Sequence, residues 1–222
     1  MRYYPIFLDI KNKPCIVIGG GKVAERKVVS LLNAGARITV ISPDVTSRLD
    51  KMAQSGKIGL IKRPYRKGDL KGALLVYATT DDKVVNTRIS EEAEKKGILL
   101  NVADAPDNCN FIVPSVVERG ALSIAISTGG TSPAFAKSLR MEMEERYGKE
   151  YALFLNIMAA IRQKLLTKGS GSDKNRKLFN KLASFSIPEM IGDERWKEVD
   201  KTIISLLGEE FSLASLGIKK GR

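Results

Sequence analysis

The sequence predicts an α/β protein whose N-terminal half is a parallel sheet with helices on both faces. Short apolar segments rich in β-branched residues recur between residues 15 and 102, and segments with apolar residues at helical spacing separate them. Glycines follow the helical segments at the positions where helices end. Because parallel neighbours require a crossover connection, strands that alternate with helices indicate a doubly wound sheet.

The elements of this half can be assigned in chain order. Strands are predicted at 15–18, 37–41, 58–61, 74–78 and 98–102. The helical stripes begin near Val23, Val45 and Val85, and the glycines expected to end them are Gly35, Gly56 and Gly97. This order is that of a Rossmann-type domain, in which ligands bind beyond the carboxyl ends of the strands.

The pattern changes after residue 112. Two strands, 111–117 and 121–126, are expected on either side of a turn at 118–120, and a helix from about 133 to 146 follows. From Tyr151 onward the apolar spacing predicts helices only, with a glycine and serine linker at 169–173. The sequence therefore predicts three parts, which are a Rossmann-type domain over 1–112, a small α+β segment over 113–150 and a helical domain over 151–222.

Composition narrows the possible chemistry. The chain has no histidine and only two cysteines, Cys15 and Cys109, so we predict no metal site and no disulfide framework, and any proton transfer must use other side chains. The formal charge of +12 fits an anionic ligand or a solvated lysine-rich surface, and the basic residues lack the aromatic interleaving of RNA-binding proteins. No apolar stretch is long enough to span a membrane and the first residues lack a signal-peptide core, so we expect a cytoplasmic protein.

A glycine-rich motif lies between the first predicted strand and the first predicted helix. The segment Gly19-Gly20-Gly21-Lys22-Val23-Ala24 matches the G-x-G-x-x-A form of the dinucleotide fingerprint. Gly19 would allow the tight turn, Gly21 would let the backbone approach a pyrophosphate, and the helix N-terminus would offer free N–H groups to that anion. A glycine-rich turn that binds nothing is the alternative.

Two further segments follow predicted strands. In Ser42-Pro43-Asp44, Asp44 either binds the adenosine ribose or caps the next helix, and the lack of an adjacent arginine favours NAD over NADP. In Thr79-Thr80-Asp81-Asp82, the polar side chains either contact the cofactor or supply an N-cap through one of the two aspartates.

Polar groups also follow the fifth predicted strand and the second strand of the α+β segment. Asn101-Val102-Ala103-Asp104 places a carboxylate just past the strand, where Asp104 is either a general base or an ordinary loop aspartate. Ser127-Thr128-Gly129-Gly130-Thr131-Ser132-Pro133 offers hydroxyls and backbone N–H groups that can bind carboxylates, with Ser132 and Pro133 placed to begin a helix.

Taken together, these motifs resemble one family, the precorrin-2 dehydrogenases, which include the dehydrogenase module of siroheme synthases. The resemblance covers about residues 4–150, with the motifs in the same order and spacing; 151–222 is similar only in being a helical extension. The residues that carry it are Pro5-Ile6-Phe7, Gly19 to Lys27, Ala78 to Asp82, Asn101 to Pro106, Phe111 to Ser115 and Ser127 to Pro133. Ala103 departs mildly from the Val-Asp-Ala-Pro motif frequent in the family.

The resemblance implies NAD-dependent oxidation of precorrin-2 to sirohydrochlorin by a homodimer that associates through 113–150. It implies that Asp104 is the catalytic residue and that the motifs above bind the cofactor and the substrate. The implied cofactor contacts are Gly19, Gly20, Gly21, Lys22, Val23, Pro43, Asp44, Thr79, Thr80 and Asp81. The implied tetrapyrrole contacts are Asn101, Ser127, Thr128, Gly129 and Thr131. Basic residues such as Lys22, Arg119, Lys137 and Arg140 would attract the carboxylates of the substrate.

Other functions fit part of this pattern. Some members of the family also insert iron into sirohydrochlorin, and the sequence leaves that second activity open. A non-catalytic NAD-binding regulatory module would need neither Asp104 nor the hydroxyl-rich loop. A dehydrogenase of another polyanionic metabolite would need the same fold, because a fold alone does not determine the substrate.

Overall fold

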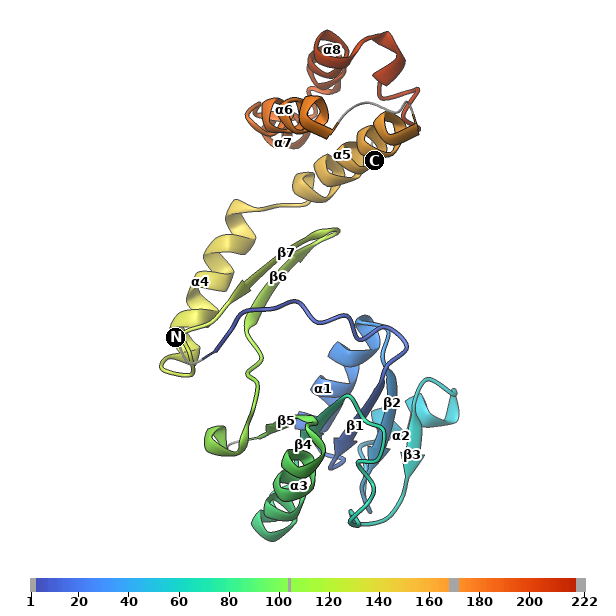
Figure 1. Cartoon of the computed structure of the whole chain (residues 1–222), viewed down its shortest axis with the longest axis vertical. Coiled ribbons are helices and arrows are strands. Elements are labelled where there is room, and N and C mark those ends of the chain that lie inside the picture. The colour runs from blue at the N-terminus through green and yellow to red at the C-terminus, as the bar shows by residue number, and fades with distance from the viewer. Residues whose placement is uncertain (1–2, 104, 168–171, 219–222) are drawn as a thin grey trace. The chain divides into compact units, whose positions relative to one another are not determined.

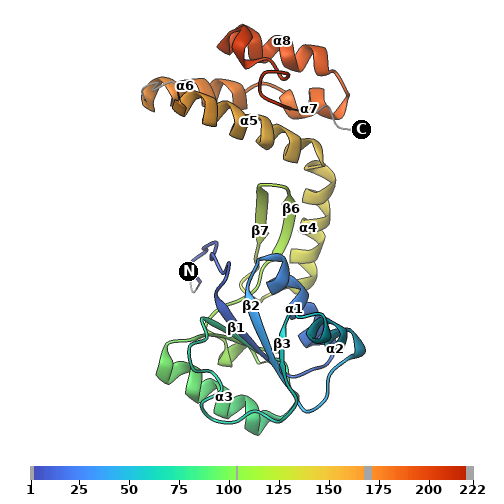
Figure 2. The ribbon, with the colours of Figure 1, turned by 90° about the vertical axis from the view of Figure 1, so that its right-hand side faces the viewer.

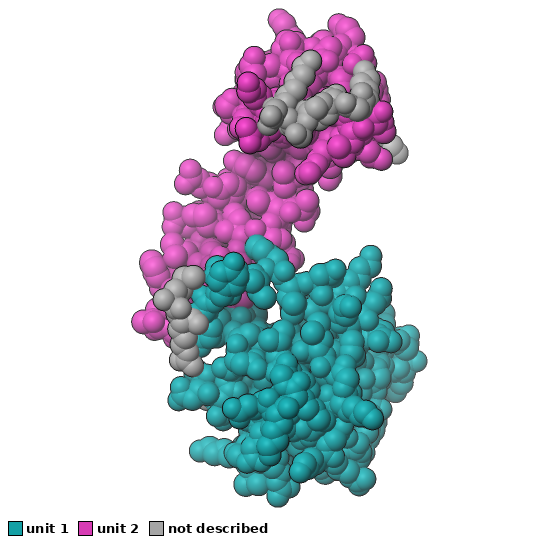
Figure 3. All heavy atoms as spheres, viewed as in Figure 1, with its two compact units in different colours: residues 1–113 teal, residues 114–222 magenta. Residues whose placement is uncertain are grey.

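The computed structural model describes residues 3–103, 105–167 and 172–218. The chain divides into two compact units, residues 1–113 and residues 114–222, which are called unit 1 and unit 2 below (Figure 3). Within the described ranges, no helix has both the length and the apolar character needed to cross a membrane.

Unit 1 contains a five-stranded parallel sheet with the strand order β3-β2-β1-β4-β5 (Figure 1). The strands are β1 (Pro14–Ile18), β2 (Arg37–Ile41), β3 (Gly59–Ile61), β4 (Leu75–Ala78) and β5 (Leu99–Val102). The predicted α/β class is confirmed. Because the chain builds outward from β1 to β3 and then returns to the other side of β1, the strand order reverses between β1 and β4, where ligands bind in such sheets.

Helices cover both faces of this sheet, as Figure 2 shows. The helices are α1 (Lys22–Asn33), α2 (Ser47–Gln54) and α3 (Lys83–Lys96). Buried residues of α1 and α2 pack with Val17 on one face, and buried residues of α3 pack with Val76 on the other. All four residues of β4 are buried, which explains why the central strands read as unbroken apolar runs in the sequence.

The helix ends agree with the sequence pattern in most places. Gly97 ends α3 in the left-handed conformation at φ 63°, as predicted for a C-terminal glycine. The second helix differs, because Thr46 is its N-cap and accepts a hydrogen bond from Leu49 N at 3.3 Å, so that Val45 lies before the helix. Asp82 caps α3 by accepting from Val84 N and Val85 N.

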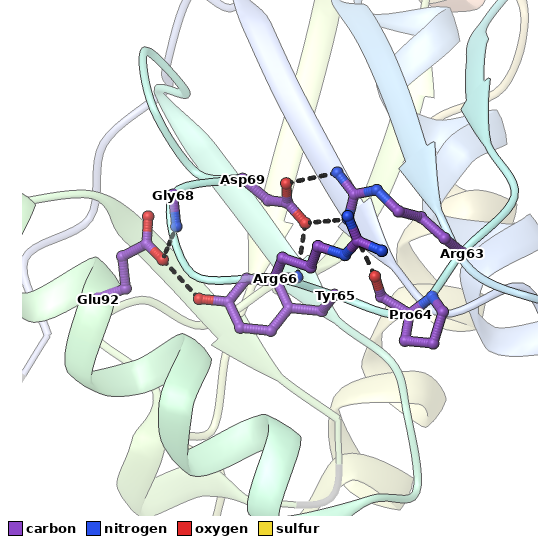
Figure 4. Close-up of polar contacts among 7 residues, drawn as sticks. All are labelled: Arg63, Pro64, Tyr65, Arg66, Gly68, Asp69 and Glu92. Atoms are coloured by element: carbon purple, nitrogen blue, oxygen red, sulfur yellow. Dashed lines mark hydrogen bonds and ion pairs between the residues drawn. The ribbon is translucent and has the colours of Figure 1, made fainter.

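The connection from β3 to β4 crosses the α3 face of the sheet without a helix of its own. Arg63 donates two hydrogen bonds of 2.7 Å to the carboxylate of Asp69, which also accepts from Arg66 N at 2.7 Å (Figure 4). These bonds close the connection into a compact loop, and they lower the pKa of Asp69 because the Arg63 guanidinium stabilises its charged form. Leu70 directly after it is fully buried, which anchors the loop to the sheet.

The loop is fastened to α3 through a buried carboxylate, that of Glu92. Its side chain is only 4% exposed, and its oxygens accept from Tyr65 OH at 2.6 Å and Gly68 N at 2.8 Å (Figure 4). They also accept from Lys96 Nζ at 2.6 Å. Burial opposes the ionisation of Glu92, but these three donors outweigh it and lower the pKa of the carboxyl. Burial and the neighbouring carboxylate together raise the pKa of the Tyr65 hydroxyl, which stays a donor.

Unit 2 begins with a two-stranded antiparallel sheet and continues as helices. Its elements are β6 (Ser115–Arg119), β7 (Leu122–Ile126), α4 (Pro133–Arg146), α5 (Glu150–Thr167), α6 (Ser172–Ala183), α7 (Ile187–Gly192) and α8 (Trp196–Leu207). Helix α4 packs on the hairpin, and a separate apolar cluster that includes Ile161, Leu182 and Val199 joins α5 to the later helices. Most of the predicted linker at 169–173 lies outside the described residues, but its last two residues belong to α6.

The first strand of the hairpin begins at Ser115, so the predicted start at Phe111 is wrong. Phe111 instead packs edge to face on Tyr77 of β4, with ring centroids 5.8 Å apart. Before it, the side chain of Asn110 accepts from Leu100 N at 2.7 Å and donates to Ile98 O at 2.8 Å along the free edge of β5. The apolar residues of 111–113 therefore follow a segment that completes the sheet of unit 1 rather than the hairpin.

We expect Glu92→Gln to destabilise unit 1 by about 2 to 3 kcal/mol at pH 7, because it removes the charge that Lys96 neutralises and one of the acceptor oxygens. Since the pKa of Glu92 is lowered in the folded protein, its contribution is present above the unfolded pKa and is lost as the pH falls through the folded value. The gap between variant and wild type should therefore narrow below about pH 4.

Urea unfolding at neutral and acidic pH measures this effect, with the exposed neighbour Glu94→Gln on the same helix as the control. An equal loss of stability in both variants at pH 7 would contradict the role given to Glu92.

Candidate functional site

The turn between β1 and α1 is held in place by the loops that follow β2 and β4. Gly19 has φ +110°, and a Cβ there would lie 2.6 Å from Thr79 Oγ1. A Cβ on Gly20 would lie 2.0 Å from the backbone oxygen of Asp44, and Thr46 N donates to Gly20 O at 2.9 Å. The turn therefore fits between its two neighbours only because it carries no side chains.

Gly21 has a different environment from the two glycines before it. No atom lies within 4 Å of a Cβ built there, and the residue is exposed. Gly21 is also the N-cap of α1 and provides no side-chain cap, so the first N–H groups of that helix are left for an outside acceptor. An open approach, free N–H groups and the positive end of a helix dipole together suit the pyrophosphate of a dinucleotide.

The first turn of α1 is also tied to α2 through a carboxylate. Glu25 accepts from Thr46 Oγ1 at 2.9 Å and from Arg48 at 3.1 Å. The hydrogen bond from Thr46 is the main cause that lowers the pKa of Glu25, and the neighbouring cations Arg48 and Lys22 add to it. Thr46 thus links α1, the glycine turn and the start of α2 at once.

Asp44 lies in this segment with its side chain exposed. Its backbone oxygen accepts from Ser42 Oγ at 2.7 Å, while its carboxylate makes no hydrogen bond or ion pair with any described residue. The alternative that Asp44 caps the following helix is wrong, because Thr46 fills that role. A free carboxylate beside the glycine turn is available to ribose hydroxyls.

The segment after β4 forms the other side of the turn. Thr79 donates from Oγ1 to Ile18 O at 2.9 Å, and Thr80 Oγ1 accepts from Asp82 N at 3.2 Å. Asp82, rather than Asp81, is the N-cap of α3, and Asp81 is exposed. The hydroxyls of both threonines thus serve the local backbone, and they hold the segment beside Gly19.

Asn86 of α3 holds the same segment through a hydrogen bond to its backbone, a role that could not be predicted from the sequence. This α3 residue is 8% exposed and donates from Nδ2 to Thr80 O at 2.9 Å, while its Oδ1 is buried without a protein partner among the described residues. A polar residue inside a helix at the first turn was the only sequence signal for it.

The carboxyl end of β5 is described except for Asp104, which lies outside the described residues. Asn101 donates from Nδ2 to Phe111 O at 3.2 Å, so part of its amide is engaged within unit 1. Cys109 Sγ accepts from Val102 N at 3.2 Å and donates to backbone oxygens of Val102 and Ala105, so this thiol orders the segment that follows β5.

A half-buried lysine and a buried tyrosine lie on the α1 face near the ends of β4 and β5. Lys27 Nζ lies 4.8 Å from the centroid of the Tyr77 ring, and burial lowers the pKa of this lysine. Burial also raises the pKa of Tyr77 to about 12, so the phenol stays protonated near neutral pH. In the sequence, Lys27 is recognisable only as part of the motif that follows the glycines, which does not indicate its contact with Tyr77.

The hydroxyl-rich loop belongs to unit 2 and precedes α4. Ser132 is the N-cap and accepts from Phe135 N, with Pro133 at the start of the helix, as predicted. Thr128 Oγ1 donates to Ser132 O at 3.0 Å, and Ser127 Oγ accepts from Gly129 N at 3.1 Å.

In the same loop, the side-chain hydroxyl of Thr131 forms no hydrogen bond with any described residue, whereas Thr131 N donates to Thr128 O at 3.1 Å. Gly129 and Gly130 have φ of 65° and 89°, which explains the glycine pair that capping alone did not. Thr131 is exposed. In the same unit, Arg119 donates to Glu144 O at 3.1 Å and Arg140 pairs with the Glu144 carboxylate.

The structure therefore brings together one part of the predicted site. The residues that meet at the carboxyl edge of the sheet are Gly19, Gly20, Gly21, Lys22, Val23, Pro43, Asp44, Thr79 and Thr80. The residues Ser127, Thr128, Gly129 and Thr131 belong to the other unit. No group of three or more metal-ligating side chains occurs in the part of the chain that the structure covers.

Comparison with known proteins gives two family matches that follow one another along the chain. Residues 6–115 match a family described as "Putative NAD(P)-binding", and residues 119–146 match one described as "Sirohaem biosynthesis protein central". The second match lies over the hairpin and α4 of unit 2. The NAD(P)-binding domain expected from the glycine motif is thus confirmed.

Curated relatives and a solved structure agree with these matches. The siroheme synthase of Methylobacillus flagellatus is 42% identical over 171 residues, which are 75% of this chain and 37% of the relative. That of Nitrosococcus oceani is 38% identical over 191 residues, which are 86% of this chain and 41% of the relative. The chain thus spans about two fifths of the length of these relatives.

Among solved structures, SirC, precorrin-2 dehydrogenase, superposes with a TM-score of 0.76 at 24% identity, covering 90% of this chain and 100% of that chain. This likeness shows that the two proteins share a fold.

We expect Gly20→Ala and Gly21→Ala to have different effects. The Gly20→Ala side chain would meet a backbone oxygen at 2.0 Å, so the turn must open and the protein should lose about 2 kcal/mol or more of stability. Gly21→Ala has open space around it, so the fold should keep its stability while the affinity for NAD falls.

Thermal unfolding without cofactor and titration of NAD against both variants separate the two effects. If Gly21→Ala bound NAD as tightly as the wild type, the pyrophosphate would not approach the backbone there.

Proposed function

We propose that this chain oxidises precorrin-2 to sirohydrochlorin, with NAD as the hydride acceptor. The premise is that the chain belongs, through residues 6–115 and 119–146, to the family of siroheme biosynthesis proteins with an NAD(P)-binding domain. The observation that carries the proposal is the turn at Gly19–Gly21, packed between the loops after β2 and β4 with the first N–H groups of α1 left free. The match at 119–146 to a family described as a sirohaem biosynthesis protein follows the NAD(P)-binding match at 6–115 along the chain.

The residues around the turn fit the parts of NAD. The backbone N–H groups of Lys22 and Val23 at the start of α1 would bind the pyrophosphate, and the free carboxylate of Asp44 would accept hydrogen bonds from the adenosine ribose. Thr79 and Thr80 would line the path toward the nicotinamide. When bound, NAD supplies the hydride acceptor, and the protein's part is to bind and orient both molecules.

The preference for NAD over NADP follows from the charges beside the ribose position. The carboxylate of Asp44 would repel a 2′-phosphate, and the next arginine along the chain, Arg48, is paired with Glu25 at 3.1 Å. A ribose phosphate would therefore meet a negative charge without a free guanidinium to balance it.

The oxidation removes a hydride and a proton from the macrocycle. A bound NAD would accept the hydride, and we assign the proton to the carboxylate of Asp104, because the chain has no histidine and this carboxylate lies two residues after the end of β5 in the sequence. The carboxylates of the substrate would be bound in part by the loop Ser127–Thr131 and by basic side chains of unit 2 such as Arg119 and Lys137.

A homodimer is the second part of the proposal. The hairpin of β6 and β7 has α4 on one face, where Val117 is fully buried, while Val116 on the opposite face is 36% exposed. On α4, Phe135 and Met141 are 56% and 51% exposed. A two-stranded sheet with an uncovered face is marginally stable by itself, and a second copy of the chain would cover these apolar residues.

The overall reaction is tested by mixing the purified chain anaerobically with precorrin-2 and NAD. We expect the formation of NADH together with sirohydrochlorin. NAD binding without NADH formation would favour a regulatory module, and NADH formation only with another polyanionic metabolite would favour a different dehydrogenase.

We expect Asp104→Asn to reduce turnover by roughly 100-fold to 10,000-fold, because the amide cannot accept the proton. NAD affinity and thermal stability should stay close to those of the wild type, since the substitution keeps the size of the side chain. The exposed Asp107→Asn serves as the matched control and should keep full activity. Steady-state rates of NADH formation decide the point, and undiminished turnover of Asp104→Asn would remove this residue from the reaction.

We expect the double variant Val116→Glu and Phe135→Glu to be monomeric, because each carboxylate would be buried without a partner in the interface. Light scattering after gel filtration measures the mass. Leu166→Glu replaces another exposed apolar residue, 66% exposed on α5, and should stay dimeric. A dimer that survives in the double variant would place the interface elsewhere.

A further inference from the structure

The α3 face of unit 1 carries a hollow that the proposed function does not use. It lies between the β3–β4 connection and α3, and its volume of about 680 Å³ falls within the range of small-molecule sites. The residues that line it, called the basic hollow below, are Tyr65, Arg66, Lys67, Gly68, Arg88, Glu91, Glu92, Lys95 and Lys96.

We propose that the basic hollow is a second anion-binding site, which takes a small molecule with two or more phosphate or carboxylate groups. Its lining contains five cations and two carboxylates. One of these carboxylates, Glu92, is buried and already neutralised by Lys96 at 2.6 Å. The surplus of positive charge therefore lies on the exposed side chains around it.

Four of these cations lie on exposed side chains that no described carboxylate contacts directly, although Arg66 still acts electrostatically on Asp69. The side chains of Arg66, Lys67, Arg88 and Lys95 form no hydrogen bond or ion pair within the described ranges, and all four residues are exposed. Only Glu91 opposes them from within the hollow. A ligand with several negative charges would gain charge-assisted hydrogen bonds here, and the guanidinium groups can bind phosphate or carboxylate through two parallel bonds.

The wall that carries these cations is built before a ligand arrives. Gly68, in the left-handed region at φ +103°, donates its N–H to Glu92, which also accepts from Tyr65 OH (Figure 4). The third donor to Glu92 is Lys96. The paired hydrogen bonds between Arg63 and Asp69 hold the other end of the same loop. Because the backbone of this loop is ordered by contacts within the protein, binding an anion costs less conformational entropy.

The basic hollow is distinct from the dinucleotide site. Helix α3 starts beside the glycine turn after its N-cap Asp82, and the α3 residues of the hollow, Arg88 to Lys96, lie six to fourteen residues further along, which corresponds to about 9 to 21 Å along the helix axis. Buried residues of α3 pack on the face of the sheet opposite to α1. An anion in the basic hollow and NAD at the glycine turn would not compete for the same groups.

Size and chemistry favour a small anion over a macromolecule. A second copy of this chain, whose net charge is also +12, would not bring the surplus of negative charge that the cations of the basic hollow favour, and the dimer proposed above uses the hairpin and α4 instead. Tyr65 is the only aromatic residue of the lining, and its hydroxyl is held by Glu92, which leaves no row of stacking rings for single-stranded nucleic acid.

The test uses calorimetric titration of the full-length chain, saturated with NAD so that the glycine turn is occupied. Inorganic pyrophosphate and citrate are titrated separately at physiological salt, and they distinguish a phosphate ligand from a carboxylate ligand. We expect saturable binding of at least one of them, at one site per chain. The double variant Lys67→Glu and Arg88→Glu should weaken it by roughly tenfold or more, and its affinity for NAD should stay unchanged.

The matched control is Lys51→Glu with Lys57→Glu, which makes the same change in net charge on exposed residues of the α2 region. It should change the affinity less than about twofold. Equal weakening in both double variants, or no saturable binding in the wild type, would overturn the proposal. If the first variant unfolds, Lys67→Ala with Arg88→Ala gives the same comparison. Since no step measures precorrin-2 oxidation, failure here would leave the proposed dehydrogenase activity untouched.

Discussion

The contact between the turn after β1 and the segment after β2 is the constraint on which the cofactor site depends. Gly20 meets the backbone oxygen of Asp44 so closely that a methyl group would lie 2.0 Å from it, and Thr46 N closes the contact with a bond of 2.9 Å. This contact determines where α1 begins. The free N–H groups of its first turn therefore face the point where the strand order reverses, and the anion site arises from backbone packing.

Most of unit 1 could be predicted because its determinants are local. The central strands are buried on both faces and read as apolar runs, and Gly97 ends α3 because its φ of 63° suits glycine. The start of β6 could not be predicted, because the apolar residues near Phe111 resemble a strand in the sequence. In the structure the side chain of Asn110, just before them, is bonded to the backbone at the edge of β5. This long-range contact depends on the fold, and the spacing of apolar residues does not report it.

The cofactor site was predicted in outline, but its supports were not. The fingerprint leaves the position of Gly20 open, although the loop after β2 makes it the most crowded of the three glycines. Both Asp44 and Thr46 are residue types that cap helices, and only the backbone decides that Thr46 does so. The donor from Asn86 to Thr80 O likewise depends on how α3 packs, which a single sequence does not report.

The charge of the chain acts at two ranges. A net charge of +12 attracts any anion from solution, but at physiological ionic strength this attraction is largely screened beyond about 8 Å. What an anion meets at contact then decides whether it stays. At the glycine turn it meets fixed backbone N–H groups, and at the basic hollow it meets long cationic side chains on α3 and on the loop that Glu92 holds in place. Because the buried carboxylate of Glu92 pairs with Lys96 alone, the other cations of the basic hollow remain available to a ligand.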